Sequence, residues 1–147
     1  MGGRPDGDAR RPRGARVILV DTSVWIEFLR GTASTATAFV RDRLGSDLAT
    51  TEPVLMEVLA GTRRGAQTEQ VERLLLSQHW LRVDPTVDYR GAVEVFQHAR
   101  AAGHQPRALQ DCLIAAVALR HGATLAHRND DYERLSSAVG LTVLDLR

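Results

Sequence analysis

Hydrophobic residues in this chain follow two patterns. Short continuous aliphatic runs are typical of strands buried on both faces of a sheet, and longer stretches with apolar residues at helical spacing are typical of amphipathic helices. The first pattern predicts strands at residues 17–20, 48–50, 80–83, 123–127 and 141–144. The second predicts helices from a Thr22 or Ser23 cap to 30, at 35–44, 52–60, 66–78, 87–102 and 109–119, and from 132 onward.

Strands that alternate with helices in this way predict a parallel sheet covered by helices on both faces. We therefore expect an α/β fold with three layers, α/β/α, around a mainly parallel central sheet. A chain of 147 residues suits a single domain, which we place at residues 17–147. Residues 1–16 are rich in Arg, Gly and Pro and offer little to bury. We expect a disordered basic arm or an over-extended gene start there, with an RNA-binding tail as the alternative.

The amino-acid composition limits the cellular compartment that we expect and the classes of catalytic chemistry that are possible. A single cysteine, Cys112, excludes an internal disulfide and favours a reducing, cytoplasmic setting. No apolar run approaches the roughly 20 residues of a membrane span, and the apolar run after Arg10 and Arg11 is too short for an export signal. All 19 basic residues are arginine. The absence of lysine excludes Schiff-base chemistry and a P-loop, whereas arginine is well suited to contacting phosphate.

Three acidic residues stand alone inside apolar runs. Asp21 ends the first strand, Glu57 lies between VLM and VLA, and Asp111 is the one ionisable residue between Leu109 and Leu119. A buried carboxylate is strongly disfavoured unless a cation or hydrogen bonds compensate it. Because the chain has no lysine, we expect these acids to share a divalent cation. Carboxylate oxygens are the ligands that Mg²⁺ and Mn²⁺ prefer.

A fourth acid is available after the strand at 123–127, where Asn129, Asp130 and Asp131 follow. Ligands of open α/β sheets gather where strands end at the carboxyl edge, so these residues and Asp21 are expected to meet. Each acid also has a structural alternative: Asp21, Asp130 or Asp131 as a helix cap, Glu57 on a solvated helix face. A structural role is also open for Asp111. Their joint occurrence favours the metal site.

Other catalytic signatures are not present in the sequence. The five histidines lack the spacing of a zinc site, and no G-x-S-x-G, Walker or G-x-G-x-x-G motif occurs. Arg63, Arg64, Arg107 and Arg128 flank the acidic positions, where they could guide a phosphate backbone or form ordinary solvated surface.

Four stretches carry a resemblance to a known family. They are VILVDTSVWIEFL, EPVLMEVLAG, RALQDCLIAAVALRHGATLAHRNDDYERL and LTVLDL. In this order they resemble the PIN-domain ribonucleases, and most closely the VapC toxins of bacterial toxin–antitoxin pairs. The resemblance covers residues 17–147, that is, all but the basic arm.

The resemblance implies a PIN-like α/β/α domain, often a homodimer, whose acidic pocket binds Mg²⁺ or Mn²⁺ and hydrolyses RNA. Asp21, Glu57 and Asp111 take the places of the family's metal-coordinating acids. Thr22 and Ser23 resemble the hydroxyl residues that support the first acid. The resemblance also implies a VapB-type antitoxin that covers the pocket by inserting an arginine among the acids.

The chain departs from the family pattern at Asn129, where an aspartate is common. Asp131 matches the second acid of that motif, and Asp130 is a further candidate. We expect Asp21 and Asp111 to bind the metal directly. Glu57 and Asp131 would then position or deprotonate the attacking water, with one ion or with a second about 4 Å away.

Two other classes of function compete with an endoribonuclease. A phosphatase or phosphotransfer domain also places acids at strand ends, but receiver domains and haloacid-type phosphatases use a lysine, and the latter an Asp-x-Asp motif. A non-catalytic module would use the acids to receive a basic partner peptide. Such a module would leave RNA intact in the presence of Mn²⁺.

Overall fold

The computed structural model describes residues 16–147, so the expected arm and its arginine pair lie outside the described residues except for Arg16. The strands are β1 (Ile18–Val20), β2 (Leu48–Thr50), β3 (His79–Trp80), β4 (Thr124–His127) and β5 (Val143–Asp145). The helices are α1 (Thr22–Arg30), α2 (Thr35–Arg43), α3 (Glu52–Ala60), α4 (Ala66–Leu76), α5 (Pro85–Ala101), α6 (Leu109–His121) and α7 (Asp130–Val139). None of these helices is long and apolar enough to cross a membrane.

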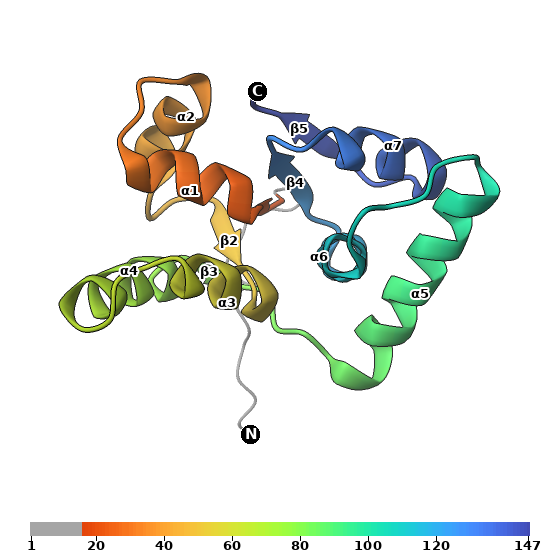
Figure 1. Cartoon of the computed structure of the whole chain (residues 1–147), viewed down its shortest axis with the longest axis horizontal. Coiled ribbons are helices and arrows are strands. Elements are labelled where there is room, and N and C mark those ends of the chain that lie inside the picture. The colour runs from red at the N-terminus through yellow and green to blue at the C-terminus, as the bar shows by residue number, and fades with distance from the viewer. Residues whose placement is uncertain (1–15) are drawn as a thin grey trace.

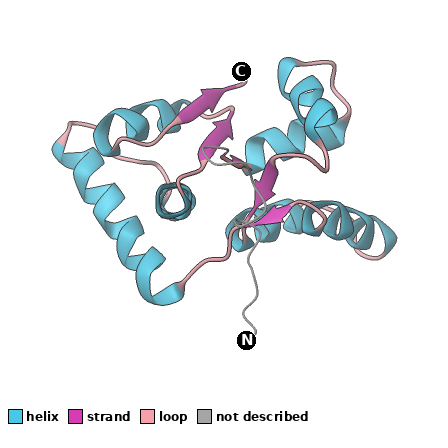
Figure 2. Cartoon of the chain, turned by 180° about the vertical axis from the view of Figure 1, so that it is seen from behind, coloured by secondary structure: helices cyan, strands magenta, loops and turns pink. Residues whose placement is uncertain are grey.

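The five strands form one parallel sheet in the order β3-β2-β1-β4-β5. The chain first moves outward from β1 to β3 and then crosses back to β4 and β5. Right-handed crossovers therefore place α1–α4 on one face and α5–α7 on the other. Figures 1 and 2 show the strands between these two groups of helices. The expected three-layer α/β/α fold is confirmed.

The core explains why β1 is central. Leu19 pairs with Ala49 on one side and with Leu125 on the other, and its side chain is fully buried. Helix α6 is buried along most of its length, as its apolar sequence predicted. It packs closely on α5, where a Cβ at Gly91 would lie 3.3 Å from the Cβ of Ala116. A larger side chain at either position would force the two helices apart.

Several element boundaries differ from the prediction for local reasons. Asp21, and not Thr22 or Ser23, caps α1. Helix α5 begins two residues early because Asp84 caps it and Pro85 suits its first turn. Strand β3 ends at Trp80, since the Glu52 carboxylate takes the Val83 N–H that a longer strand would have used.

At the C-terminal end of the chain, α7 begins at Asp130, two residues before the expected start. The side chain of Asn129 caps it by accepting the Asp131 N–H. Strand β5 lies later than expected, at Val143–Asp145.

Candidate active site

Asp21 lies at the carboxyl end of β1 and at the start of α1, so strand and helix together fix its position. Its Oδ2 accepts hydrogen bonds from the backbone N–H of Ser23 at 3.0 Å and from the Ser23 hydroxyl at 2.6 Å. The side chain is 4% exposed. Asp21 is therefore both a helix cap and a fixed acid at the sheet edge, with Oδ1 free of these two contacts.

Asp111 reaches the same point from the first turn of α6 on the opposite face of the sheet. The phenol oxygen of Tyr132 lies 2.9 Å from Oδ1 of Asp21 and 3.3 Å from Oδ1 of Asp111. The Asn129 side-chain amide donates to Oδ2 of Asp111 at 3.2 Å. The two acids thus share one hydroxyl group as a neighbour.

Glu57 joins this group from α3. Its Oε1 accepts a hydrogen bond of 2.6 Å from the hydroxyl of Thr22, the residue that follows Asp21. The side chain is half-buried, so it remains in contact with solvent. The three acids that the sequence singled out therefore converge at one edge of the sheet.

The charge of this cluster is not balanced within the described residues. Burial and the negative charges of Asp21, Glu57 and Asp131 together raise the pKa of Asp111 to about 6, against the lowering effect of the Tyr132 hydrogen bond. Burial and the charge of Asp111 also raise the pKa of the adjacent Cys112 thiol to about 11. Cys112 therefore stays a protonated thiol at neutral pH and offers no thiolate ligand. The donor atoms of the cluster are its carboxylate oxygens.

This donor set suits a hard divalent cation. Carboxylates are oxygen ligands of the kind that Mg²⁺ and Mn²⁺ bind. Burial and neighbouring negative charges raise the pKa of Asp111, and a bound cation would neutralise those charges. Among residues 16–147, no group of three or more His, Cys, Asp or Glu side chains is arranged so that it could hold a metal ion. Mg²⁺ can be bound through one or two carboxylates, because it usually retains several water ligands.

The acids after β4 point in different directions. Asp131 is 2% exposed and faces the loop before α6, where the Arg107 N–H donates to it at 3.3 Å and His104 Nε2 lies 3.5 Å away. Asp130 turns outward and pairs with Arg134 and Arg147. Neither acts as the cap of α7, which is Asn129.

Two of the four arginines expected near the site, Arg107 and Arg128, also differ. Arg107 is 78% exposed beside Asp131, at the edge of the acidic cluster. Arg128 donates its backbone N–H to the Ser23 hydroxyl. Its guanidinium contacts Glu27 and the carbonyl of Leu146. Arg107 therefore forms an ion pair of 3.7 Å with Asp131 but is still largely open to solvent, whereas both contacts of the Arg128 guanidinium are within the fold.

The sequence did not point to Tyr132 as a functional residue. Its hydroxyl nevertheless lies between two of the candidate acids. Behind it, the buried His127 shares a hydrogen bond of 2.8 Å with Glu133 and accepts the Asn129 N–H at 3.0 Å through Nδ1. The one available signal was a hydroxyl on an otherwise core aromatic residue.

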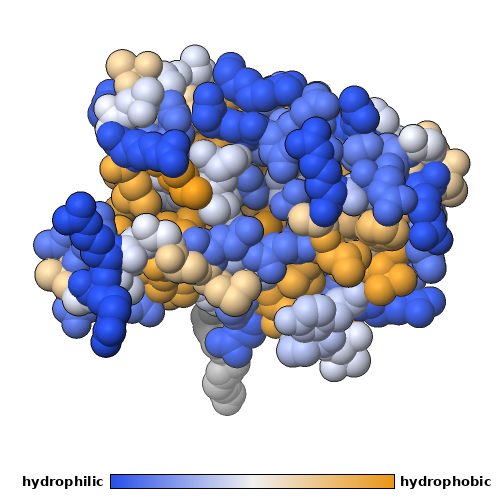
Figure 3. All heavy atoms as spheres, viewed as in Figure 1, coloured by the Kyte–Doolittle hydropathy of each residue, from blue (hydrophilic) through white to orange (hydrophobic). Residues whose placement is uncertain are grey.

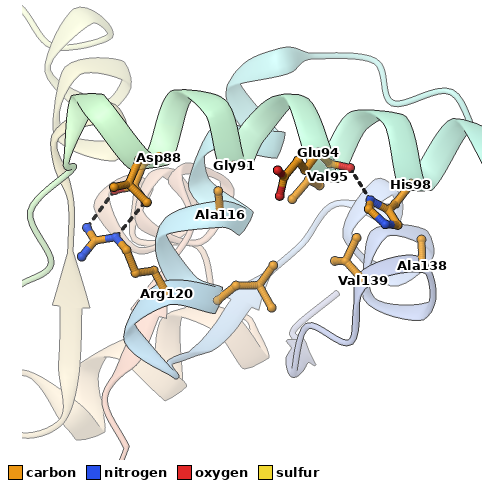
Figure 4. A pocket seen from close by; sticks show the side chains of 11 residues that line it. Asp88, Gly91, Glu94, Val95, His98, Ala116, Arg120, Ala138 and Val139 are labelled. Atoms are coloured by element: carbon orange, nitrogen blue, oxygen red, sulfur yellow. Dashed lines mark hydrogen bonds and ion pairs between the residues drawn. The ribbon is translucent and has the colours of Figure 1, made fainter.

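A separate cavity of about 550 Å³ lies between α5, α6 and α7. Figure 4 shows it with the Asp88–Arg120 ion pair at one end and His98 and Val139 at the other. None of the four candidate acids lines it. The acidic cluster at the carboxyl ends of the strands is therefore distinct from this cavity.

Comparison with known proteins identifies the fold and the family. The PIN domain model matches residues 18–137. The chain is 38% identical over 134 residues to the ribonuclease VapC11 of Mycobacterium tuberculosis and to the VapC ribonuclease Mb1587 of Mycobacterium bovis, covering 89% of this chain and 100% of each relative. The DNA-bound VapBC structure from Salmonella typhimurium superposes with a TM-score of 0.69 at 17% identity, covering 90% of this chain and 100% of that chain. The chain therefore belongs to the PIN-domain family and, within it, to the VapC ribonucleases.

Proposed function

We propose that this protein is the toxin of a type II toxin–antitoxin pair and acts as an endoribonuclease that requires Mg²⁺ or Mn²⁺. The observation that carries the proposal is the convergence of Asp21, Glu57 and Asp111 at one sheet edge, with an unbalanced negative charge. The relatives at 38% identity are named ribonucleases. An RNA phosphodiester is the substrate class that fits both the acidic site and the ribonuclease relatives.

Asp21 and Asp111 are the residues that would hold the cation. When bound, a divalent cation stabilises negative charge on a phosphate and lowers the pKa of a coordinated water. Each carboxylate is oriented through Oδ2, by Ser23 in one case and by Asn129 in the other. Because both carboxylates are already held in place, little conformational entropy is lost when the cation and the substrate bind.

Glu57 is the residue we assign to the attacking water. The Thr22 hydroxyl fixes one of its oxygens, and its partial exposure leaves the carboxylate within reach of solvent. Asp131 acts from behind the cluster: its charge reaches Asp111, and it holds the loop that carries Arg107. We propose that Arg107, at the edge of the site, contacts the phosphate backbone of the RNA.

A cognate VapB-type antitoxin is the partner that fits this site. The relative from Salmonella typhimurium was solved as a VapBC complex on DNA. An unbalanced cluster of acids would accept an arginine of the partner through charge-assisted hydrogen bonds. The same contact would exclude the cation and the RNA, so binding of the antitoxin would inhibit the nuclease.

We also propose a homodimer. Apolar side chains reach the surface between α3, α5 and α6 (Figure 3), where a groove of about 420 Å³ is lined in part by Met56, Tyr89 and Leu113. Met56 is 59% and Leu109 61% exposed. A second copy would cover this surface, which sedimentation of the protein and of a Met56→Lys variant would test. The buried free thiol of Cys112 suits a reducing cytoplasm.

The test is cleavage of labelled RNA by the purified protein with Mg²⁺, with Mn²⁺ and with EDTA. We expect cleavage that requires metal and is lost in Asp111→Asn. Asp130→Asn is the matched control, since that carboxylate lies in ion pairs with Arg134 and Arg147 at the surface. Metal-independent cleavage, or full activity of Asp111→Asn, would contradict the proposal. Hydrolysis of a small phosphomonoester in place of RNA would favour the phosphatase alternative.

A further inference from the structure

Tyr132 has a hydroxyl group that the core does not need. The residue lies in the first turn of α7, is fully buried, and packs its ring against His127 with a centroid separation of 5.4 Å. A phenylalanine would fill nearly the same volume without a polar atom to satisfy. The hydroxyl finds its partners in the carboxylates of Asp21 and Asp111.

The two carboxylates are held in matching ways around this hydroxyl. Oδ2 of Asp21 is bound by Ser23, and Oδ2 of Asp111 is bound by Asn129. In both acids Oδ1 faces the phenol oxygen of Tyr132. Each carboxylate is therefore fixed at Oδ2 by its own donor, and the Tyr132 hydroxyl is the neighbour that the two Oδ1 atoms have in common.

The phenol itself is rigid. Its ring is enclosed on all sides, and the backbone N–H of Tyr132 donates to the Asn129 carbonyl at 3.1 Å. A phenol carries its proton at neutral pH, so the hydroxyl is a hydrogen-bond donor to the acids that it faces.

One proton cannot satisfy two carboxylates at once. The hydroxyl donates to one acid while its lone pairs face the other, so the group of three retains negative charge. A cation bound by the two acids would remove this conflict. The hydroxyl would then act on the metal through its ligands, as the donors around metal-binding carboxylates commonly do.

We propose that Tyr132 is a positioning residue, whose hydroxyl sets the separation and orientation of Asp21 and Asp111 for a divalent cation. This inference rests on the proposed metal-dependent nuclease and adds a residue to its site. The hydroxyl touches neither the RNA nor the attacking water in this role. Its effect should therefore be visible in metal binding without any substrate.

The first test is Mn²⁺ binding to the RNA-free protein, measured by calorimetry and by electron paramagnetic resonance of the free ion. Tyr132→Phe should weaken binding by about 10-fold or more, the usual effect of losing a donor to a metal ligand. Ser137→Ala is the matched control, because it removes an exposed hydroxyl from the same helix, one that donates to the Glu133 carbonyl and not to the acids. Its affinity should equal that of the wild type.

A second measurement does not depend on the Tyr132 variant. In Tyr89→Phe protein, Tyr132 is the one remaining tyrosine, so a ring-labelled tyrosine gives a single assigned resonance. Mg²⁺, which is diamagnetic, should shift that resonance as it binds. Melting curves in EDTA check that Tyr132→Phe is folded.

The outcomes separate the two proposals. Equal Mn²⁺ affinity of wild type and Tyr132→Phe, or a Tyr132 resonance that Mg²⁺ leaves unmoved while calorimetry detects binding, would overturn the role of Tyr132 alone. A wild-type protein that binds neither Mn²⁺ nor Mg²⁺ would overturn the metal-dependent nuclease, and the positioning role with it.

Discussion

The two ends of α6 hold acidic groups in opposite situations. Near its C-terminal end, the guanidinium of Arg120 donates two hydrogen bonds of 2.8 Å to the carboxylate of Asp88, which is 1% exposed. Near its N-terminal end, Asp111 lies among three other acids and a phenol. The buried carboxylate of Asp88 has its cation within the chain, and the half-buried carboxylate of Asp111 has none among the described residues.

We expect this difference to separate a structural acid, Asp88, from a functional one, Asp111. Burial by itself raises the pKa of Asp88, but the hydrogen bonds and charge of Arg120 bring it below its ordinary value. At Asp111, burial and like charges act in the same direction and raise the pKa to about 6. A buried ion pair completes a fold, whereas an unbalanced acidic cluster is stabilised by a ligand that brings positive charge.

The largest expected effect is on RNA cleavage, which should distinguish Asp111 from Asp88. Asp111→Asn should lower RNA cleavage by at least about 100-fold, because charge stabilisation at the reacting centre is lost, and should also abolish growth inhibition. Asp88→Asn should retain cleavage at temperatures below its melting point, since Asp88 lies among α5 and α6 and away from the cluster. Initial rates on labelled RNA measure both. Comparable loss in the two variants would remove the distinction.

The next effect concerns stability. Arg120→Ala leaves Asp88 buried without its cation and should lower the free energy of unfolding by about 2–3 kcal/mol. This is less than a fully buried pair would lose, because the Arg120 side chain is 33% exposed. Denaturant melts measure the change. The double variant Asp88→Asn, Arg120→Gln should recover part of it, and no recovery would indicate that the arginine acts through packing alone.

The two acids should also respond to pH with opposite sign. Asp111 has a folded pKa of about 6 against an ordinary 3.8, so its contribution to the stability of the metal-free protein is present below about pH 4 and is lost as the pH rises through 6. For Asp88 the lowered pKa gives stability above about pH 4 that is lost as the pH falls. We define the difference as the melting temperature of Asp111→Asn minus that of the wild type, both in EDTA. This difference should increase by about 3 °C or more between pH 4 and pH 7. A constant difference would contradict the assignment.

The smallest effect is expected at Asp130. Its side chain is 46% exposed and pairs with Arg134 and Arg147 at the surface. Exposed pairs contribute little, so Asp130→Asn should change the free energy of unfolding by less than about 0.5 kcal/mol and leave cleavage unchanged. A large loss of cleavage would place Asp130 in the site, contrary to the direction in which it points.

The sequence by itself determined the elements and the three central acids. An aliphatic run that stops at Asp21 specifies a buried strand ending at the sheet edge, and parallel order follows from the alternation of strands and helices. Glu57 and Asp111 stand out because apolar neighbours on a helix leave a single charged residue facing the interior. These are local properties, decided by spacing of a few residues, and a single sequence contains them.

Only the tertiary structure decided which way the remaining polar groups face. Tyr132 meets Asp21 across 111 positions of sequence, while Asp131 turns to the loop before α6 and Arg128 is engaged by Glu27. At the start of α7, Asp130 points outward, Asp131 points toward the loop before α6, and Tyr132 points into the acidic cluster. Neighbouring residues of one helix turn therefore have entirely different partners. Such directions depend on how α6 and α7 pack against β1 and β4, and that packing is a property of the whole fold.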